Sequence, residues 1–422
     1  MLADLWNLVS TKLGRASAWL VIGGVTAGVM GYVFQVLMGR MLTVQDYGLF
    51  NALMAHLVIL SAPMGALMMM VTRRVSACRA VGDHGSIRHL YYSTNFRAVF
   101  VTGAAVAICF LFLGWVQSYL EVSDSNVIVL MGLVFLSLPP KVINNSFLQG
   151  LQYFRWLSIV SVLEIVFKIV CVVILVQIGY GLSGVFGGVF ISGVLVWLII
   201  YIVLHRPLID GQKKQYRTDH FTFRLVLPVL LANTAFVVMT QLDIVIVKYY
   251  FTAEEVGFYA AASIMGKAVM YLPGYISLAL FPMVAEDHVQ GKDSAGLLFQ
   301  AIGLTVLLCS IGALFYFMFG EWVIALLYGE SYRESGEILR YFGFAMFPMA
   351  LVMVAEHFLI ARGRVLFGYI FFFTAPFQIL AIHFFHDSLF MILVVVGISG
   401  LLHVVVGFSL LLRRDLRRAR SA

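Results

Sequence analysis

The sequence is poor in charge for its length. Only 12% of the 422 residues are Asp, Glu, Lys or Arg, whereas 62% are hydrophobic. Soluble domains carry about twice that share of charged residues. A soluble fold could not bury so much apolar surface, so the composition excludes a water-soluble protein. Because helices satisfy their own backbone hydrogen bonds in hydrocarbon, we expect an all-α integral membrane protein.

Motifs of the common catalytic and metal sites are also missing. The four cysteines are scattered and form no CxxC pair, which argues against a disulfide frame or a metal site. The sequence has no HExxH, GxSxG or P-loop motif. His383 and His386 share a helix face in principle, but polar residues are ordinary at a helix end, so we predict no metal. We therefore expect a protein that is not an enzyme and has no cofactor.

Apolar runs recur along the whole chain, and a helix needs about 20 such residues to cross a bilayer. No stretch between the runs is long enough for a separate soluble domain. We expect about twelve spans of the length that a bilayer requires. They are 16–39, 48–71, 98–118, 127–149, 158–178, 183–204, 225–250, 257–283, 296–319, 338–361, 365–386 and 389–412.

Basic residues gather in alternate loops. With the N-terminus inside, the inner segments collect most of the 28 Lys and Arg residues, among them Arg73, Arg74, Arg417 and Arg418. The outer loops instead carry acids such as Glu254. Basic residues stay on the cytoplasmic side during insertion, so we expect both termini to be cytoplasmic. The net charge of +7 therefore reflects basic residues in the cytoplasmic loops. Since membrane topology accounts for these residues, we expect no nucleic-acid partner.

A short polar hairpin occurs twice. Residues 43–52 (TVQDYGLFNA) return in register as 252–261 (TAEEVGFYAA), each copy between two apolar runs. The same offset places Pro139 on Pro348. We expect Gly48 and Gly257 to take the backbone conformation that turns one helix into the next.

This repeat predicts a duplicated six-helix unit. An even number of helices in each half makes the halves parallel, with a cavity between them. The expected domains are an N-terminal lobe (1–204), a cytoplasmic linker (205–224) and a C-terminal lobe with a basic cytoplasmic tail (225–422).

A few charged residues fall inside the expected spans. Each costs roughly 2.5–3.5 kcal/mol at the centre of a membrane helix, so each should face a partner or a water-filled cavity. Lys248 lies near a helix end, from which a lysine can reach the interface. The remaining residues of interest are Lys141, Glu164, Lys168, Asp243, Lys267, Glu356 and His357.

Several interpretations of these residues stay open. Glu164 and Lys168 are four residues apart on one helix face and can form a structural salt bridge. Asp243 can carry a proton or form an ion pair between helices. Glu356 and His357 can form a proton relay or simple hydrogen bonds between helices.

The hairpin resembles a signature of a known family. Residues 39–48 (GRMLTVQDYG) and the stretch from Asp243 to Tyr259 resemble the first-loop motifs of Wzx-type polysaccharide and O-antigen flippases. These flippases belong to the multidrug/oligosaccharidyl-lipid/polysaccharide (MOP) exporter superfamily. Arg73-Arg74 and the segment 148–150 (LQG) also fit the family. The resemblance covers nearly the whole chain.

The resemblance implies a transporter that moves undecaprenyl-pyrophosphate-linked oligosaccharide across the bacterial inner membrane by alternating access. Lys141, Lys168 and Lys267 would then bind the pyrophosphate, as point charges that need no fixed geometry. Asp243, Glu164, Glu356 and His357 are the candidates for coupling to an ion gradient. Membrane lipids, a polysaccharide polymerase and glycosyltransferases are the expected partners.

Two other functions remain open. A drug antiporter of the same superfamily would need a cavity dominated by carboxylates and aromatic residues, whereas the spans of this chain hold more lysines than acids. A membrane-embedded polymerase or acyltransferase should show a large outer loop or a His/Asp constellation, and neither is evident.

Overall fold

The computed structural model describes residues 12–122, 124–209, 223–271, 273–274, 276, 280, 284, 294–362 and 366–419. All regular elements within these residues are helices, which confirms the expected all-α membrane fold. Nine of the described helices are long and apolar enough to cross a membrane, or ten if one broken pair counts as a span. The count of twelve is therefore not confirmed.

The difference in count has local causes. The run from Phe154 to His205 is counted once, although it contains two helices that pack against each other. The expected span 257–283 is described as a helix only to Tyr271, and much of the rest lies outside the described residues. Most of the expected linker 205–224 also lies outside them.

Contacts divide the chain into two compact units. Unit 1 holds Met1–Leu37 and Met64–Phe221, and unit 2 holds Met38–Pro63 and Thr222–Ala422. The predicted N-terminal lobe, 1–204, instead includes residues 38–63. These residues pack with the second half of the chain because α3 (Val44–Ser61) lies against α10 (Phe223–Tyr250) and α11 (Ala253–Tyr271). The division into two six-helix lobes stays a prediction.

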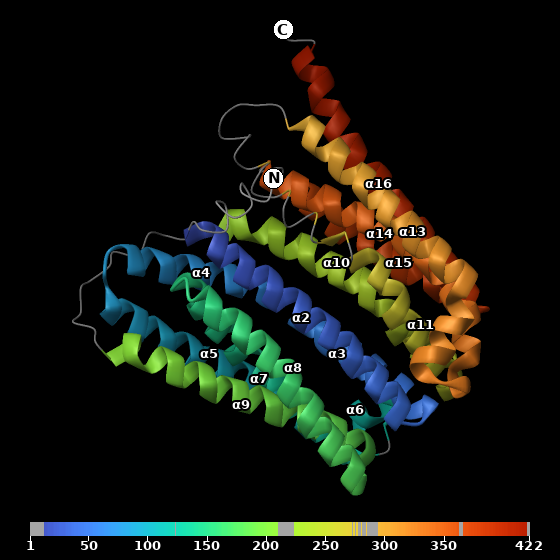
Figure 1. Ribbon diagram of the computed structural model, residues 1–422, viewed down its shortest axis with the longest axis horizontal. Coiled ribbons are helices and arrows are strands. Elements are labelled where there is room, and N and C mark those ends of the chain that lie inside the picture. The colour runs from blue at the N-terminus through green and yellow to red at the C-terminus, as the bar shows by residue number, and fades with distance from the viewer. Residues whose placement is uncertain are drawn as a thin grey trace. The chain divides into compact units, whose positions relative to one another are not determined.

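The remaining helices are distributed as follows. Unit 1 contains α2 (Lys12–Met41, as far as Leu37), α4 (Met64–Ala80), α5 (His84–Leu111), α6 (Leu113–Leu120), α7 (Ser125–Gly150), α8 (Phe154–Leu175) and α9 (Gly181–Ile209) (Figure 1). Unit 2 adds α13 (Ala295–Tyr328), a 3₁₀ turn (Glu330–Tyr332), α14 (Arg333–Ala361), α15 (Leu366–Phe384) and α16 (Leu389–Ala419).

Unit 1 is a bundle around α7, which packs on α4, α5 and α9. Its core is apolar and includes Val75, Ile143, Phe147 and Ile200, all fully buried. Helix α7 continues through Pro139 and Pro140. A π-helical turn, Val176–Tyr180, joins α8 to α9, and the chain reverses there because glycine tolerates a positive φ, which is +101° at Gly179.

A hydrogen bond between side chains joins the first turns of α7 and α9. The Ser183 hydroxyl donates to Asp124 Oδ2 at 2.7 Å, and Asp124 Oδ1 accepts the backbone N–H of Asn126 at 2.9 Å. These bonds stabilise the charged carboxylate, and the bond from Ser183 has the larger effect. They therefore lower the pKa of Asp124 below its ordinary value.

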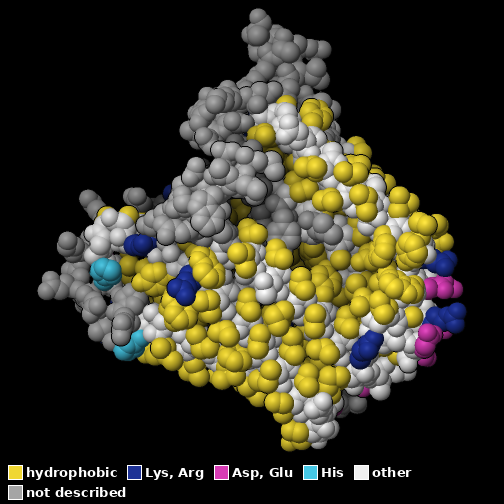
Figure 2. Space-filling model, viewed as in Figure 1, with side chains coloured by type: hydrophobic (Ala, Val, Ile, Leu, Met, Phe, Trp, Pro, Cys, Tyr) yellow, Lys and Arg dark blue, Asp and Glu magenta, His cyan; other side chains and the backbone are white. Residues whose placement is uncertain are grey.

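Unit 2 is organised around α14, which packs on α11, α13 and α16. Helix α14 is buried along much of its length, and Phe342, Met349 and Phe358 are almost fully enclosed. In both units the outward surface is apolar. Figure 2 shows hydrophobic side chains over most of the visible described surface, with charged side chains few and scattered. Such a surface suits hydrocarbon rather than water.

The hairpin repeat forms two equivalent helix starts. Thr43 caps α3 by accepting the backbone N–H of Asp46 at 3.1 Å. Thr252 and Glu255 bond reciprocally at the start of α11, with Thr252 N to Glu255 Oε2 at 2.9 Å. The threonine and the acid that recur in the sequence are therefore capping residues, a known way to satisfy the free N–H groups of a helix start.

The repeated glycines have a different role from the predicted one. Gly48 and Gly257 lie inside α3 and α11 and do not have positive φ, so the turning role was wrong. A β-carbon on Gly48 would lie 2.6 Å from the backbone nitrogen of Gly257. The two copies of the repeat thus cross backbone to backbone, an approach that a side chain on either glycine would block.

Candidate functional site

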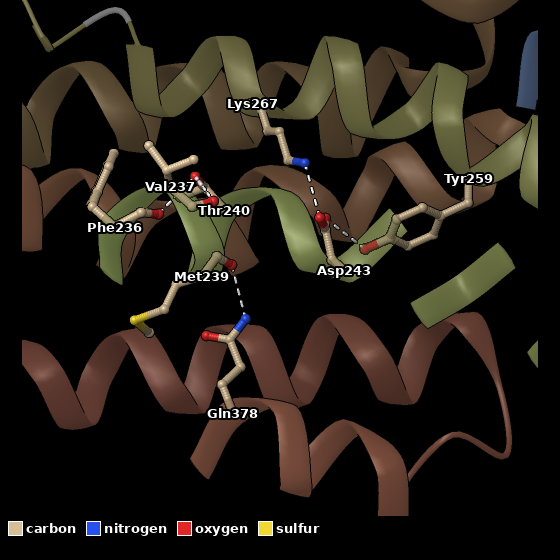
Figure 3. Close-up of polar contacts among 8 residues, drawn as sticks. All are labelled: Phe236, Val237, Met239, Thr240, Asp243, Tyr259, Lys267 and Gln378. Atoms are coloured by element: carbon tan, nitrogen blue, oxygen red, sulfur yellow. Dashed lines mark hydrogen bonds and ion pairs between the residues drawn. The ribbon is translucent and has the colours of Figure 1, made fainter. Parts of the chain in front are cut away.

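The most enclosed charged pair of the described residues lies in unit 2. Lys267 on α11 places its Nζ 3.1 Å from Asp243 Oδ1 on α10, and both side chains are at most 5% exposed. The Tyr259 hydroxyl donates to Asp243 Oδ2 at 3.0 Å (Figure 3). Each carboxylate oxygen therefore has a donor, which is the condition for an ion pair to persist away from water.

The positions of these three residues follow from the helix repeat. Tyr259 and Lys267 lie about two turns apart on α11, so both side chains reach the same side of that helix. Asp243 lies on α10, which precedes α11 in the chain. Removing one partner of such a pair leaves an uncompensated buried charge, which typically costs about 3–5 kcal/mol. The structure thus shows Asp243 in an ion pair between helices, which is one of the two roles considered for it from the sequence.

The same region of α10 also binds α15. Gln378 is 3% exposed and donates from Nε2 to the Met239 carbonyl at 2.9 Å (Figure 3). Met239 lies one turn before Asp243 on α10. Its carbonyl therefore bonds to α15 close to the buried charge. Gln378 is a polar residue of this region that the sequence analysis missed.

Unit 1 contains a second pair, between Lys141 on α7 and Glu164 on α8. The Lys141 Nζ donates to Glu164 Oε1. This pair is less enclosed than the first, since the side chains are 34% and 20% exposed. The expected partner of Glu164 within its own helix was Lys168, but the carboxylate bonds to α7 instead.

Lys168 has a different neighbour. Its Nζ lies 4.8 Å from the centre of the Phe34 ring on α2, a distance at which a cation is attracted to the face of the ring. The structure therefore brings Lys141, Glu164 and Lys168 together within unit 1. Lys267, the third predicted cationic residue, belongs to unit 2.

Glu356 and His357 are adjacent on α14 but have different surroundings. Glu356 is 5% exposed. His357 Nδ1 bonds to the Met353 carbonyl of its own helix at 2.8 Å. This bond lies within one helix, so it is not the predicted bond between helices. Nothing in the described contacts links the two side chains into a relay.

The histidines at the end of α15 form an aromatic cluster. His383 Nδ1 lies 2.5 Å from the Tyr250 hydroxyl, and the His386 ring stacks on Tyr250 with centroids 3.8 Å apart. No set of His, Cys, Asp or Glu suited to a metal occurs among the described residues. The two histidines therefore tie the ends of α10 and α15 together.

A polar contact between α15 and α16 was also not expected from the sequence. His403 on α16 is 6% exposed and bonds through Nε2 to the Thr374 hydroxyl on α15 at 2.7 Å. The charged residues singled out inside the expected spans did not include this histidine, which lies in a strongly apolar run. An ionisable residue in a span is itself the signal that would have found it.

Comparison with known proteins identifies the family. A model described as "Polysaccharide biosynthesis protein" matches residues 13–288, most of the chain. The chain belongs to this family. The comparison with curated proteins gave no significant match.

Solved structures show the fold of this family member. An inward-facing multidrug resistance MATE transporter of the MOP superfamily has a TM-score of 0.75 at 14% identity, with 94% of this chain and 96% of that chain covered. The lipid II flippase MurJ in an inward closed conformation has a TM-score of 0.70 at 13% identity, with 93% and 87% covered. At these identities the likeness concerns the fold, which is that of the MOP transporters, as the sequence predicted.

Proposed function

We propose that this member of the polysaccharide biosynthesis family moves undecaprenyl-pyrophosphate-linked oligosaccharide across the bacterial cytoplasmic membrane. The observation that carries the proposal is Lys141, a lysine with a partly exposed side chain inside a membrane-spanning helix. A lysine at that depth is costly unless water or an anion reaches it. A pyrophosphate-linked saccharide supplies the anion.

Lys141 and Lys168 are the pyrophosphate-binding residues of this proposal. Glu164 holds the Lys141 ammonium when no cargo is bound, and the pyrophosphate then competes with this carboxylate. Both partners are partly exposed, so the exchange does not require a fully buried charge to lose its partner. The third predicted cationic residue, Lys267, is paired with Asp243, whose other carboxylate oxygen accepts the Tyr259 hydroxyl. We therefore assign Lys267 to coupling rather than to cargo.

Coupling to an ion gradient rests on Asp243. Protonation of this carboxylate would weaken its attraction to Lys267 and so change the packing of α10 against α11. Glu164, Glu356 and His357 remain further candidates for coupling. Alternating access also requires contacts between helices that form and break. For the contact on the outer side of the membrane, our candidate is the crossing of α3 and α11 at Gly48 and Gly257. Both termini are cytoplasmic in this proposal.

The experiment that tests the proposal uses the purified protein in proteoliposomes with a fluorescent undecaprenyl-pyrophosphate oligosaccharide. We expect the wild-type chain to move the labelled lipid between leaflets and Lys141→Ala to move it much more slowly. Transport at the wild-type rate by the variant would contradict the role of Lys141. If a cationic dye moves and the lipid-linked saccharide does not, the chain is a drug antiporter.

A further inference from the structure

Both ring nitrogens of His403 have hydrogen-bond partners. Nδ1 lies 2.7 Å from the Ser399 carbonyl of its own helix, and Nε2 lies 2.7 Å from the Thr374 hydroxyl on α15. The face of the ring is also covered, since Phe371 packs against it at 4.8 Å between centroids. The ring therefore has one orientation, in which both nitrogens have hydrogen-bond partners.

The Ser399 carbonyl and the Thr374 hydroxyl differ in whether they can donate a hydrogen bond. A carbonyl oxygen only accepts hydrogen bonds, so Nδ1 must carry a hydrogen whether the ring is neutral or charged. A hydroxyl can donate or accept. Thr374 also lies 2.8 Å from the Ile370 carbonyl, which offers its hydrogen a second acceptor.

These contacts give the ring hydrogen-bond partners in two protonation states. When the ring is neutral, the Thr374 hydroxyl donates to Nε2. When a proton from water is added at Nε2, that nitrogen donates to Thr374 Oγ1, and the hydroxyl hydrogen turns to the Ile370 carbonyl. No heavy atom moves and no hydrogen bond of the ring is lost in either direction. A histidine that only joined two helices would need just one of these arrangements.

We propose that His403 is a proton-binding residue of unit 2, which takes up and releases a proton at Nε2 during transport. This inference rests on the proposed function for its role in coupling, whereas its titration can be measured without cargo. The ordinary pKa of histidine lies near neutrality, so small changes in its surroundings can change its charge.

A cavity beside the ring offers a path for the proton. It has a volume of about 580 Å³, lies between α15 and α16, and is lined mainly by apolar side chains together with Thr374, Gln378, Ser399 and His403. Gln378 Oε1 is buried and has no hydrogen-bond partner among the described residues. In our proposal the proton reaches the ring from the polar residues at this cavity, where a water molecule needs about two to four polar partners.

Among the described residues, no charged group contacts the ring to balance the added proton. Helices α10, α14 and α15 pack against α16. Their described titratable residues inside the bundle or near its ends include Asp243, Lys248, Glu356, His357, Tyr369 and His383. The contacts recorded for the His403 ring are with Thr374, Ser399 and Phe371, none of which is charged.

Asp243 lies on the helix that Gln378 bonds to, one turn from the residue whose carbonyl accepts that bond. Gln378 lies one turn from Thr374 on α15 and bonds to the Met239 carbonyl, one turn from Asp243. In our proposal, a positive ring at His403 acts on α10 through the bond between Gln378 and Met239. This connection gives the proton a way to influence α10.

The first experiment measures titration directly. We expect ¹⁵N-histidine NMR of the full chain in nanodiscs to show one ring that titrates at Nε2 and keeps its hydrogen on Nδ1. His403→Gln, which removes one of the ten histidines, assigns the signal. His56→Gln is the matched control, because His56 Nδ1 also bonds to a carbonyl four residues earlier, at Ala52.

A second experiment changes the hydroxyl group of Thr374, which is the hydrogen-bond partner of His403 Nε2. Thr374→Val removes the acceptor for the Nε2 hydrogen, so we expect the titration midpoint to fall by about one pH unit, a tenfold loss of proton affinity. Thr374→Ser should restore it. A His403 ring that stays in one state from about pH 5 to 8, or a midpoint unchanged in Thr374→Val, would overturn the proposal.

Transport separates this inference from the proposed function. In proteoliposomes, His403→Gln should move the lipid-linked saccharide down its gradient but lose acceleration by a pH gradient. Retained acceleration would refute the coupling role. Failure of the wild-type chain to move any lipid-linked saccharide would refute the proposed function, while the titration of His403 would stand or fall on the NMR result.

Discussion

Gly48 and Gly257 cross without side chains between them, so that the backbones of α3 and α11 touch. A β-carbon on Gly48 would lie 2.9 Å from the Gly257 α-carbon as well as 2.6 Å from its nitrogen. The obstacle in both cases is backbone, which cannot turn away as a long side chain can. The helices would have to separate to admit even one methyl group.

Gly48→Ala is therefore expected to weaken the packing of α3 against α11. Overpacking of this kind typically costs about 1–3 kcal/mol. We expect a lower midpoint of thermal unfolding in detergent and reduced surface glycan in cells. Gly31→Ala is the matched control, because a β-carbon on Gly31 in α2 has open space around it. Equal midpoints for the two variants would show that the crossing tolerates a side chain.

Single and double changes at the buried pair of unit 2 should have opposite effects. Lys267→Met leaves Asp243 charged and enclosed, and we expect a loss of about 3–5 kcal/mol in the free energy of unfolding. Asp243→Asn combined with Lys267→Met removes both charges and should recover much of that loss. A double variant less stable than Lys267→Met would contradict a direct interaction between the two side chains.

The gradient dependence of transport should also change with Asp243. Asp243→Asn keeps the size of the side chain and its capacity to accept the Tyr259 hydroxyl, but it removes the charge. The variant leaves Lys267 charged and enclosed, so we expect less folded protein. Transport driven by a proton or sodium gradient should fall even when it is measured per folded molecule. Tyr259→Phe is the comparison, because it removes one hydrogen bond and keeps the ion pair. Unchanged gradient dependence in Asp243→Asn would discard this residue as the coupling group.

The ion pair of Lys141 with Glu164 can be compared with the ion pair of Arg340 with Glu321. Both pairs join neighbouring helices and are partly exposed, with side chains 34% and 20% exposed in the first and 41% and 37% in the second. Partly exposed pairs contribute about 0–1 kcal/mol to stability. We expect Lys141→Gln to lower surface glycan at a normal protein level, whereas Arg340→Gln should leave both unchanged. Equal glycan levels in the two variants would remove the cargo-binding role.

Glu356→Gln tests the enclosed carboxyl group of α14. A buried carboxylate is costly, and an amide of the same size is less so. We expect the variant to unfold at a temperature equal to or above that of the wild type at neutral pH. If Glu356 takes part in coupling, gradient-driven transport falls in spite of this stability. A stable variant with full coupling would limit Glu356 to a structural role.

Composition and spacing by themselves determined the membrane class and the helical fold, and the resemblance of the hairpin motifs pointed to a family of polysaccharide biosynthesis. They succeeded because hydrocarbon imposes a length and an apolar composition on each helix, and both are local properties of the chain. The duplicated hairpin and the charges inside the spans at Lys141, Asp243 and Lys267 were visible in the sequence for the same reason.

Only the tertiary structure decided which of these groups meet. Helices that are apolar on every side give no periodic signal of the face they bury. The partner of Glu164 on a neighbouring helix, the crossing at Gly48 and the pairing of His403 with Thr374 therefore could not be deduced. Each depends on how one helix is rotated against the next, which is set by packing over the whole bundle and not by any short stretch of sequence.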